Sequence, residues 1–326
     1  MATMSLGKAL NAGLRQAMER DPKVVLMGED IGKLGGVFRV TEGLQRDFGD
    51  RRVIDTPLAE SGVVGTAVGL AMRGYRPVCE IQFDGFVYPA FDQIVSQVAK
   101  LRHRNEGRVA MPVTIRVPYG GGIGAVEHHS ESPEAYFAHT AGLRVVTPSS
   151  AGDGHRMIQQ AIASDDPVVF FEPKRRYWER DEVDDASLLS GMPLHQARVI
   201  VEGTDATIAA YGPMVATALA AARIGNEEGT SIEVIDLRSL SPVDFDTIET
   251  SVRKTGRLVV AQEASVFCGL GAEIAARVSE RCFYHLESPV RRVGGFATPY
   301  PPSRLERHYL PDADRILHEV DRCLQA

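Results

Sequence analysis

Apolar and polar positions follow one another along this chain in a pattern that predicts strands alternating with helices. In the first half, apolar runs of strand length stand between segments whose apolar residues recur at helical spacing. The expected strands are VVLMG (24–28), RVID (52–55), PVCEIQF (77–83), MPVTIRV (111–117), LRVVTP (143–148) and PVVFFEP (167–173). Several are apolar throughout, which is typical of a parallel sheet covered on both faces.

Helical spacing marks the segments between these strands. Ser5 precedes a helix whose apolar face carries Leu6, Leu10 and Leu14, and serine is a favoured N-cap residue. Further helices are expected from Glu60 to Met72, around 91–101 and at 151–164.

From 174 to 196 the pattern breaks into polar residues without periodicity, which indicates a crossing between domains. A second series follows, with the strands ATIAAYG, SIEVIDL and RLVVAQE and helices near 213–224, 244–254, 270–283 and 312–324. The sequence therefore predicts an α/β chain with two parallel-sheet domains, at 1–180 and 197–326, joined by a linker at 181–196.

Composition excludes several classes of function. The chain has 326 residues, 44% of them hydrophobic, and a net charge of −7 with acids and bases interspersed, which argues against a nucleic-acid or membrane partner. The scattered cysteines, Cys79, Cys268, Cys282 and Cys323, fit a reducing compartment. Because no apolar run reaches membrane-spanning length and the first residues show no hydrophobic signal core, we expect a cytoplasmic protein.

One carboxylate, Glu60, stands at the start of a helix that has only small or apolar residues from Gly62 to Met72. Such a helix should be buried, and burying an acid is costly unless something binds it or shares its proton. Either Glu60 complements the helix dipole, or it is held ready for a cofactor nitrogen.

Glycine-rich segments offer weaker motifs. GLGAEIAARV (269–278) begins like a dinucleotide fingerprint but has Ile274 at the third glycine position, so a helix-opening turn explains it. GGGIG (120–124) lacks the Lys-Ser/Thr of a P-loop and is expected to be a flexible loop. That loop leads to His128 and His129, which are either surface residues or, near neutral pH, proton-transfer groups.

Taken together, these motifs resemble the beta chain of the thiamin-diphosphate-dependent decarboxylating component of 2-oxo acid dehydrogenase complexes. The matching blocks run in family order over nearly the whole chain: GEDIGKLGGVFRVTEGL (28–44), DTPLAESGVVGTAVGLA (55–71), EIQFDGFVYPAFDQIVSQVAK (80–100), HHSESPEAYFAHTAGLRVVTPS (128–149), DPVVFFEPKR (166–175), VIDLRSLSPVD (234–244) and TPYPPSRLE (298–306). The resemblance implies a pyrimidine-binding domain followed by a smaller transketolase C-terminal-like domain. HSESPEAYFAH and FDGFVYPAFDQ look closer to branched-chain members than to pyruvate members.

The resemblance also implies roles for single residues. Glu60 matches the glutamate that hydrogen-bonds N1′ of the cofactor's aminopyrimidine, and His129 matches the histidine that assists acyl transfer to lipoamide. The positions that match cofactor-binding residues are Glu29, Leu58, Glu60, Gln82 and Phe86. Phe86 stands where many branched-chain relatives have tyrosine. Some relatives hold a potassium ion, and the matching positions are Met111, Val113, Thr114, Ala161, Ser164 and Asp166.

The sequence lacks the motif with which thiamin enzymes bind magnesium and the cofactor's diphosphate. They bind magnesium and diphosphate through Gly-Asp-Gly followed some 25–30 residues later by asparagine, whereas Gly152-Asp153-Gly154 is followed only by the distant Asn226. We interpret 149–154 as a helix N-terminus and expect magnesium and diphosphate to be held by an alpha subunit in an α2β2 assembly, with a lipoyl acyltransferase as further partner. A self-contained thiamin enzyme of the transketolase type, a pyruvate or acetoin counterpart and a non-catalytic assembly subunit are the alternatives.

Overall fold

The structure, a computed structural model, describes residues 2–183 and 191–326, so residues 184–190 of the predicted linker lie outside the described residues. The chain divides into two compact units. The first comprises residues 1–119 and 136–194, and the second comprises residues 120–135 and 195–326. The segment 120–135 thus groups with the second unit, although it lies within the stretch 1–180 that the sequence analysis assigned to the first domain.

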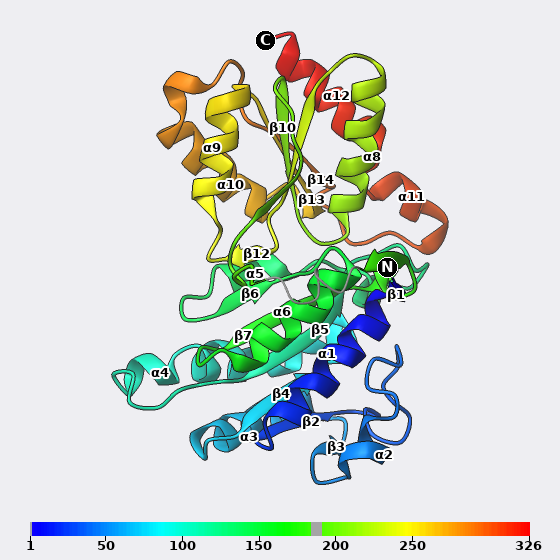
Figure 1. Ribbon diagram of the computed structural model, residues 1–326, viewed down its shortest axis with the longest axis vertical. Coiled ribbons are helices and arrows are strands. Elements are labelled where there is room, and N and C mark those ends of the chain that lie inside the picture. Colours follow the sequence, from blue (N-terminus) through cyan, green and yellow to red (C-terminus); the bar gives the residue numbers. More distant parts are fainter. Residues whose placement is uncertain (1, 184–190) are drawn as a thin grey trace. The chain divides into compact units, whose positions relative to one another are not determined.

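A parallel sheet forms the centre of the first unit (Figure 1). Its strands lie in the order β6-β7-β5-β4-β2-β3. Their bounds are β2 (Val24–Gly28), β3 (Val53–Asp55), β4 (Arg76–Glu80), β5 (Thr114–Tyr119), β6 (Arg144–Val146) and β7 (Val168–Pro173). Each of the six strands expected in this half is confirmed, and the parallel arrangement expected from their apolar runs is confirmed too.

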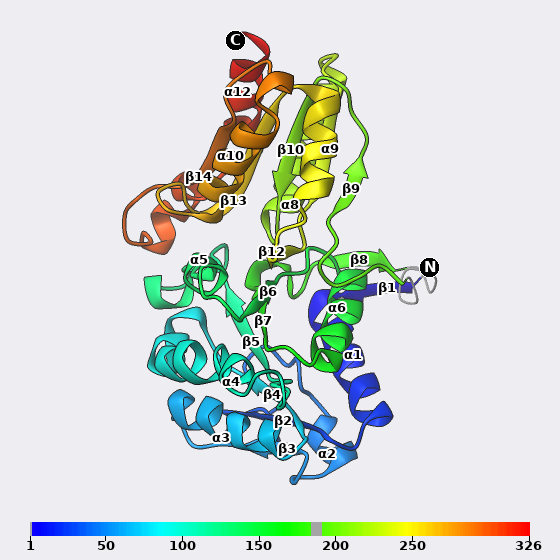
Figure 2. The same ribbon diagram turned by 90° about the vertical axis from the view of Figure 1, so that its left-hand side faces the viewer.

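Helices cover both faces of this sheet (Figure 2). On one face lie α1 (Leu6–Arg20) and α6 (Ala151–Ala163). Helix α1 begins after the predicted Ser5, and α6 begins in the segment 149–154 that was interpreted as a helix N-terminus, with Ser150 as its N-cap. On the other lie α3 (Glu60–Met72) and the segment 84–104. That segment is no single helix: it consists of η1 (Asp84–Ala90), a π-helical turn η2 (Gln93–Val98) and α4 (Leu101–Arg104). Two shorter helices, α2 (Leu44–Phe48) and α5 (Glu134–Ala138), complete this half of the chain.

The polar stretch after β7 contains structure that its lack of periodicity concealed. After the short turn η4 (Lys174–Arg176), β8 (Arg180–Val183) pairs antiparallel with the N-terminal strand β1 (Ala2–Ser5). Both strands are only four residues long, and β8 is charged, so neither shows an apolar run.

Helix α3 departs from the expectation that it is buried. Val63, Val64, Ala67 and Ala71 are buried, but Gly62, Thr66, Gly69 and Met72 are exposed. A β-carbon added at Gly69 would meet no atom within 4 Å. The described chain therefore covers only one side of a helix whose residues are small or apolar on every side.

The second unit is a smaller α/β layer structure. Its sheet has the order β14-β13-β10-β11-β9, in which only β9 is antiparallel to its neighbour. The strands of this sheet are β9 (Arg198–Val201), β10 (Ala206–Ala210), β11 (Ile232–Asp236), β13 (Leu258–Ser265) and β14 (Arg291–Gly295). The short strand β12 (Ser239–Ser241) lies in the same stretch of chain but is not part of this sheet. Strands β10, β11 and β13 are confirmed, whereas β9 and β14 were not predicted.

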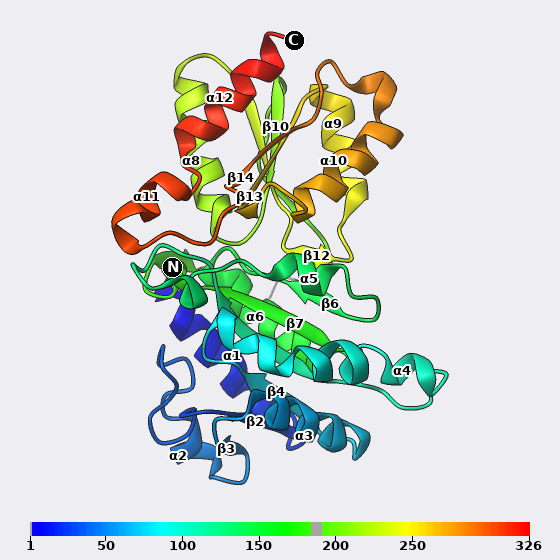
Figure 3. The ribbon, with the colours of Figure 1, turned by 180° about the vertical axis from the view of Figure 1, so that it is seen from behind.

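Four helices flank this sheet (Figure 3). Helices α8 (Met214–Glu227) and α12 (Ala313–Leu324) lie on one face, and α9 (Phe245–Thr255) and α10 (Leu270–Arg281) lie on the other. All four were expected, and Gly269 is the N-cap of α10, which confirms the helix-opening turn. The turns η3 (Glu127–His129), η5 (Phe283–His285) and η6 (Ser303–Leu305) and the short α11 (Glu306–Tyr309) complete the unit.

A layer of buried charges lies at the carboxyl ends of β4, β5 and β7. Arg116 of β5 bonds the Glu172 carboxylate through Nε at 2.6 Å and a terminal nitrogen at 2.9 Å, and it also pairs with Glu80. Lys174 and Asp84 form a second pair whose side chains are both fully buried. Burial raises the pKa of the Glu80 carboxyl above its ordinary value, although Arg116 opposes the rise.

We expect Arg116→Met to destabilise the chain strongly. The substitution leaves two buried carboxylates facing each other without their shared cation, and breaking a buried pair in this way commonly costs about 3–5 kcal/mol in the free energy of unfolding. Urea unfolding measures the loss. The matched control is Arg108→Met, whose partner Glu106 is exposed, and it should change the free energy by less than about 0.5 kcal/mol. Equal effects of the two substitutions would contradict this account of the layer.

Candidate active site

Three carboxylates gather where β2 and β3 end. Glu29 and Asp30 directly follow β2, and Glu60 opens α3 five residues after β3 ends. Because β2 and β3 are parallel neighbours, their carboxyl ends meet at the same edge of the sheet, where α/β proteins bind ligands. Burial, the charge of Asp30 and the charge of Glu60 together raise the pKa of Glu29. Glu29 and Glu60 are thus close enough to influence each other's charge.

Aromatic rings follow the next strand along this edge. Gln82 and Phe83 come directly after β4, which is the other parallel neighbour of β2, and Phe86 lies on the first turn of η1. The Phe83 and Phe86 rings are half-buried and meet edge to face, with centroids 6.0 Å apart. Leu58, in the turn before Glu60, is 71% exposed.

The structure therefore brings the predicted cofactor-binding residues of the first unit to the ends of three adjacent strands. Their donor set, half-buried carboxylates beside an aromatic wall, fits a flat heterocycle with a proton-bearing ring nitrogen. Beneath them lies the buried charge layer. The sequence analysis assigned no function to the charged residues of this layer. A pattern that marks them was present, because the apolar runs PVCEIQF, MPVTIRV and PVVFFEP each carry one charged residue.

The second unit carries the predicted histidine. His129 lies on η3 with its side chain half-buried, whereas the adjacent His128 is exposed. Nδ1 of His129 lies 2.9 Å from the carbonyl oxygen of His128. A carbonyl can only accept, so Nδ1 carries the proton in this bond, and in the neutral ring the lone pair stays on Nε2.

The positions that match a potassium site lie in two neighbouring segments of the first unit. Met111 donates its backbone N–H to the carbonyl of Asp165 at 3.0 Å, which joins the start of β5 to the turn after α6. Thr114 Oγ1 is buried and has no hydrogen-bond partner, as a cation ligand would require. The Asp166 carboxylate, however, already pairs with Arg102 and Arg144.

The predicted Gly152-Asp153-Gly154 segment is a helix N-terminus, as expected. Ser150 accepts the Asp153 backbone N–H, and the Asp153 carboxylate pairs with Arg156 at 2.6 Å. Across residues 2–183 and 191–326, no cluster of three or more His, Cys, Asp and Glu side chains could hold a metal ion. No helix within these ranges is long and apolar enough to cross a membrane.

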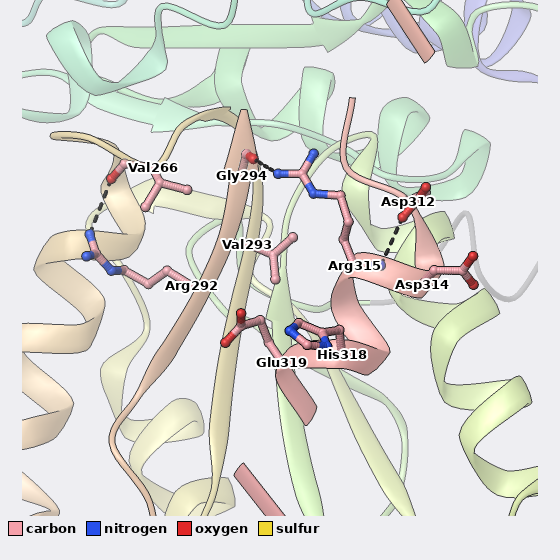
Figure 4. A pocket seen from close by; sticks show the side chains of 9 residues that line it. All are labelled: Val266, Arg292, Val293, Gly294, Asp312, Asp314, Arg315, His318 and Glu319. Carbon is pink, nitrogen blue, oxygen red and sulfur yellow. Dashed lines mark hydrogen bonds between the residues drawn. The ribbon is translucent and has the colours of Figure 1, made fainter. Parts of the chain in front are cut away.

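A hollow of about 350 Å³ lies between β14 and α12 of the second unit (Figure 4). Two arginines of the hollow already donate hydrogen bonds to backbone carbonyls. Arg292 donates to the carbonyl of Val266, and Arg315 donates to those of Gly294 and Tyr309. Asp312 caps α12. None of the residues that the motifs predicted lines this hollow, so we do not assign the site to it.

Comparison with known families matches both halves of the chain. Residues 2–179 match the transketolase pyrimidine-binding domain, and residues 195–316 match the transketolase C-terminal domain. Among solved structures, a chain described as "Split gene transketolase, inactive beta4 tetramer" superposes with a TM-score of 0.82 at 26% identity. That match covers 99% of this chain and 98% of the other.

Curated relatives match over nearly their whole length. The chain is 64% identical to the pyruvate dehydrogenase E1 component subunit beta of Leifsonia xyli, over 99% of this chain and 95% of the relative. It is 53% identical to the 3-methyl-2-oxobutanoate dehydrogenase subunit beta of Mycobacterium tuberculosis, over 99% of this chain and 92% of the relative. A 2-oxoisovalerate dehydrogenase subunit beta from Pseudomonas aeruginosa is 45% identical over 97% and 93%. With two transketolase-like domains and these relatives, the chain belongs to the beta-subunit family of the decarboxylating E1 component of 2-oxo acid dehydrogenases, which are thiamin-diphosphate enzymes.

Proposed function

We propose that this chain forms, with an alpha subunit in an α2β2 assembly, an enzyme that decarboxylates a branched-chain 2-oxo acid on thiamin diphosphate and acylates the lipoyl group of an acyltransferase. The observation that carries the proposal is the convergence of Glu29, Glu60 and the Phe83–Phe86 rings at one sheet edge. Bound there, the cofactor would supply the electron sink that decarboxylation needs.

Glu60 is the acid that holds a proton at N1′ of the aminopyrimidine in this proposal. Its place at the head of α3 supports that role, and so does its proximity to Glu29, whose pKa the charge of Glu60 helps to raise. Phe86 offers a flat surface for the pyrimidine, and because it lacks a hydroxyl it adds no hydrogen bond. We assign Gln82, which follows β4, and the exposed Leu58, which precedes Glu60 in the chain, to the same cofactor site.

His129 serves the second half of the reaction. With Nδ1–H bonded to the His128 carbonyl, the ring is held in the tautomer whose Nε2 can accept or return a proton. A lipoyl group that accepts the acyl unit needs such a proton exchange at its sulfur atoms.

The alpha subunit is proposed from the exposed side of α3. Gly62, Thr66 and Gly69 present a side of small residues, and this chain does not need the glycines for its own packing, because a β-carbon at Gly62 would meet only Ala59, at 3.6 Å. Small residues let another helix approach closely. We assign magnesium and diphosphate binding to that partner. Potassium binding beside the unpartnered Thr114 hydroxyl is a further part of this proposal.

The choice of a branched-chain 2-oxo acid as substrate has less direct support than the choice of reaction. Two of the relatives carry names of branched-chain enzymes, whereas the one with 64% identity is named for pyruvate, which makes pyruvate the second candidate. Co-expression with the alpha chain and an artificial-acceptor assay with 3-methyl-2-oxobutanoate, 4-methyl-2-oxopentanoate, pyruvate and acetoin decides between them. The highest kcat/KM on pyruvate would replace the branched-chain assignment.

Cofactor binding should require both chains. Isothermal titration of thiamin diphosphate into this chain alone should give weak binding or none, with or without magnesium. With the alpha chain present, we expect tight, magnesium-dependent binding of one cofactor per αβ pair. Micromolar, magnesium-dependent binding to the lone chain would instead support a self-contained thiamin enzyme, and no binding to either form would support an assembly subunit.

Glu60→Gln should leave the fold intact and abolish most decarboxylation. An amide cannot share its proton with N1′ as an acid does, and loss of a positioned acid–base group commonly lowers the rate about 10²–10⁴-fold. The artificial-acceptor assay on the assembled enzyme measures this, with Glu19→Gln on the exposed side of α1 as the equal-charge control. Turnover near that of the control would remove Glu60 from the mechanism.

Glu29→Gln tests whether the two acids repel each other. A raised pKa means that the folded chain binds this proton more tightly than the unfolded chain, so the folded state loses stability as pH rises through the raised value. The variant carries no such charge, so its gain in urea midpoint over wild type should be larger at about pH 7.5 than at about pH 4. A gain that is the same at both pH values, or that Glu19→Gln reproduces, would contradict the pairing.

A further inference from the structure

The glycine run before the histidines is not the flexible loop that its sequence suggests. Gly120, Gly122 and Gly124 have φ values of 81°, 87° and 70°, alternating with residues of negative φ. Successive backbone N–H groups in a turn can face a shared anion, and we call the N–H donors of Gly121, Gly122 and Gly124 the glycine nest. In this chain the nest is filled by the chain's own carboxylates.

Glu306, at the start of α11, supplies the outer carboxylate. Its two oxygens accept the backbone N–H groups of Gly122 at 2.9 Å and of Gly124 at 3.3 Å. Glu263 of β13, which is 2% exposed, accepts the N–H of Gly121 at 2.5 Å. Three N–H donors of the run are thereby held by residues that lie more than 130 positions away in the sequence.

A tyrosine locks Glu306 in place. The Tyr300 hydroxyl donates to Glu306 at 2.7 Å, and its ring packs edge to face on Tyr309, with centroids 5.0 Å apart. A β-carbon at Gly121 would lie 1.7 Å from that hydroxyl, so only glycine fits there. Burial and the hydrogen bond to Glu306 raise the pKa of Tyr300, which keeps its hydroxyl a donor.

The far end of the loop is also fastened to the second unit. The hydroxyl of Tyr211, which is buried, donates to the carboxylate of Glu134 at 2.7 Å. His129 therefore lies between two anchors, one on each side in the sequence. Nδ1 of His129 lies 2.9 Å from the neighbouring His128 carbonyl oxygen, and the two anchors hold the loop that carries this imidazole.

We propose that Glu306 is a positioning residue for His129: by filling the glycine nest it holds the histidine loop in the conformation that acyl transfer needs. The inference rests on the proposed role of His129. It also assigns a purpose to TPYPPSRLE, a block that resemblance marked without giving it a task. Glu306→Gln is the direct perturbation, because an amide presents only one accepting oxygen to two N–H donors.

The first measurement does not depend on activity. Glutamate-specific proteolysis of the full chain, followed by mass spectrometry, should cut Glu306→Gln after Glu127 and Glu131 several times faster than wild type. Glu280→Gln, an equal charge change at an exposed site in the same unit, should cut like wild type. Unchanged cleavage in Glu306→Gln would overturn the anchoring itself.

The second measurement separates positioning from general stability. In the assembled enzyme, Glu306→Gln should lower transfer to a lipoyl domain about 10- to 100-fold, because misplacing a catalytic group is costly, while decarboxylation with an artificial acceptor changes less than about threefold. His129→Ala should show the same split more strongly. The double variant should transfer no worse than His129→Ala alone, since the two residues would act through one group.

The outcomes distinguish this inference from the function on which it rests. If His129→Ala spares transfer, the role of His129 fails; if it abolishes transfer but Glu306→Gln does not lower it, or if the two losses multiply, the positioning inference fails. Should Glu306→Gln not fold, Tyr300→Phe removes only the hydroxyl that fixes Glu306. Tyr300→Phe should also lower transfer to the lipoyl domain more than decarboxylation, but by a smaller factor. If the ratio of the two activities stayed at the wild-type value in Tyr300→Phe, the inference would be overturned as well.

Discussion

The first unit depends on a layer of charges enclosed in its interior. Arg116, flanked by Glu80 and Glu172, and the fully buried pair of Lys174 and Asp84 lie where the central strands end. Burial and the nearby charge of Glu172 raise the pKa of Glu80, whereas the charge of Arg116 opposes the rise. Such a layer tolerates one geometry only, because each displaced partner would leave a buried charge alone. It ties the ends of β4, β5 and β7 together immediately beneath the residues proposed to bind the cofactor.

Much of the fold could be predicted because its causes are local. Apolar runs predicted β2, β5 and β7, Ser5 predicted where α1 begins, and the segment 149–154 predicted where α6 begins. What failed depended on distant partners. Strands β1 and β8 are short and polar and exist because they pair with each other. Strand β14, RRVGG, has too few apolar residues to stand out and is defined by its neighbour β13.

In the candidate site, too, the residues with local causes could be predicted and those that depend on distant partners could not. Glu60 could be singled out because an acid at the head of an apolar helix is anomalous within a single segment. This chain alone buries only one side of α3, because a pattern shows that a side is apolar but not which molecule covers it. Glu306 escaped notice for a third reason: a glycine run reads as flexible unless the residues that accept its N–H groups are known, and these come from far along the chain.

That separation in sequence has a consequence for the order in which the chain is made. The first unit needs residue 183 before β8 can close on β1, but the histidine loop at 120–135 needs residues up to Glu306 before its nest is filled. During synthesis strands β2 to β7 can therefore already be paired while the loop at 120–135 is still unanchored. The segment that contains Tyr300 and Glu306 is made after all of these strands, and it supplies the bonds that anchor the histidine loop.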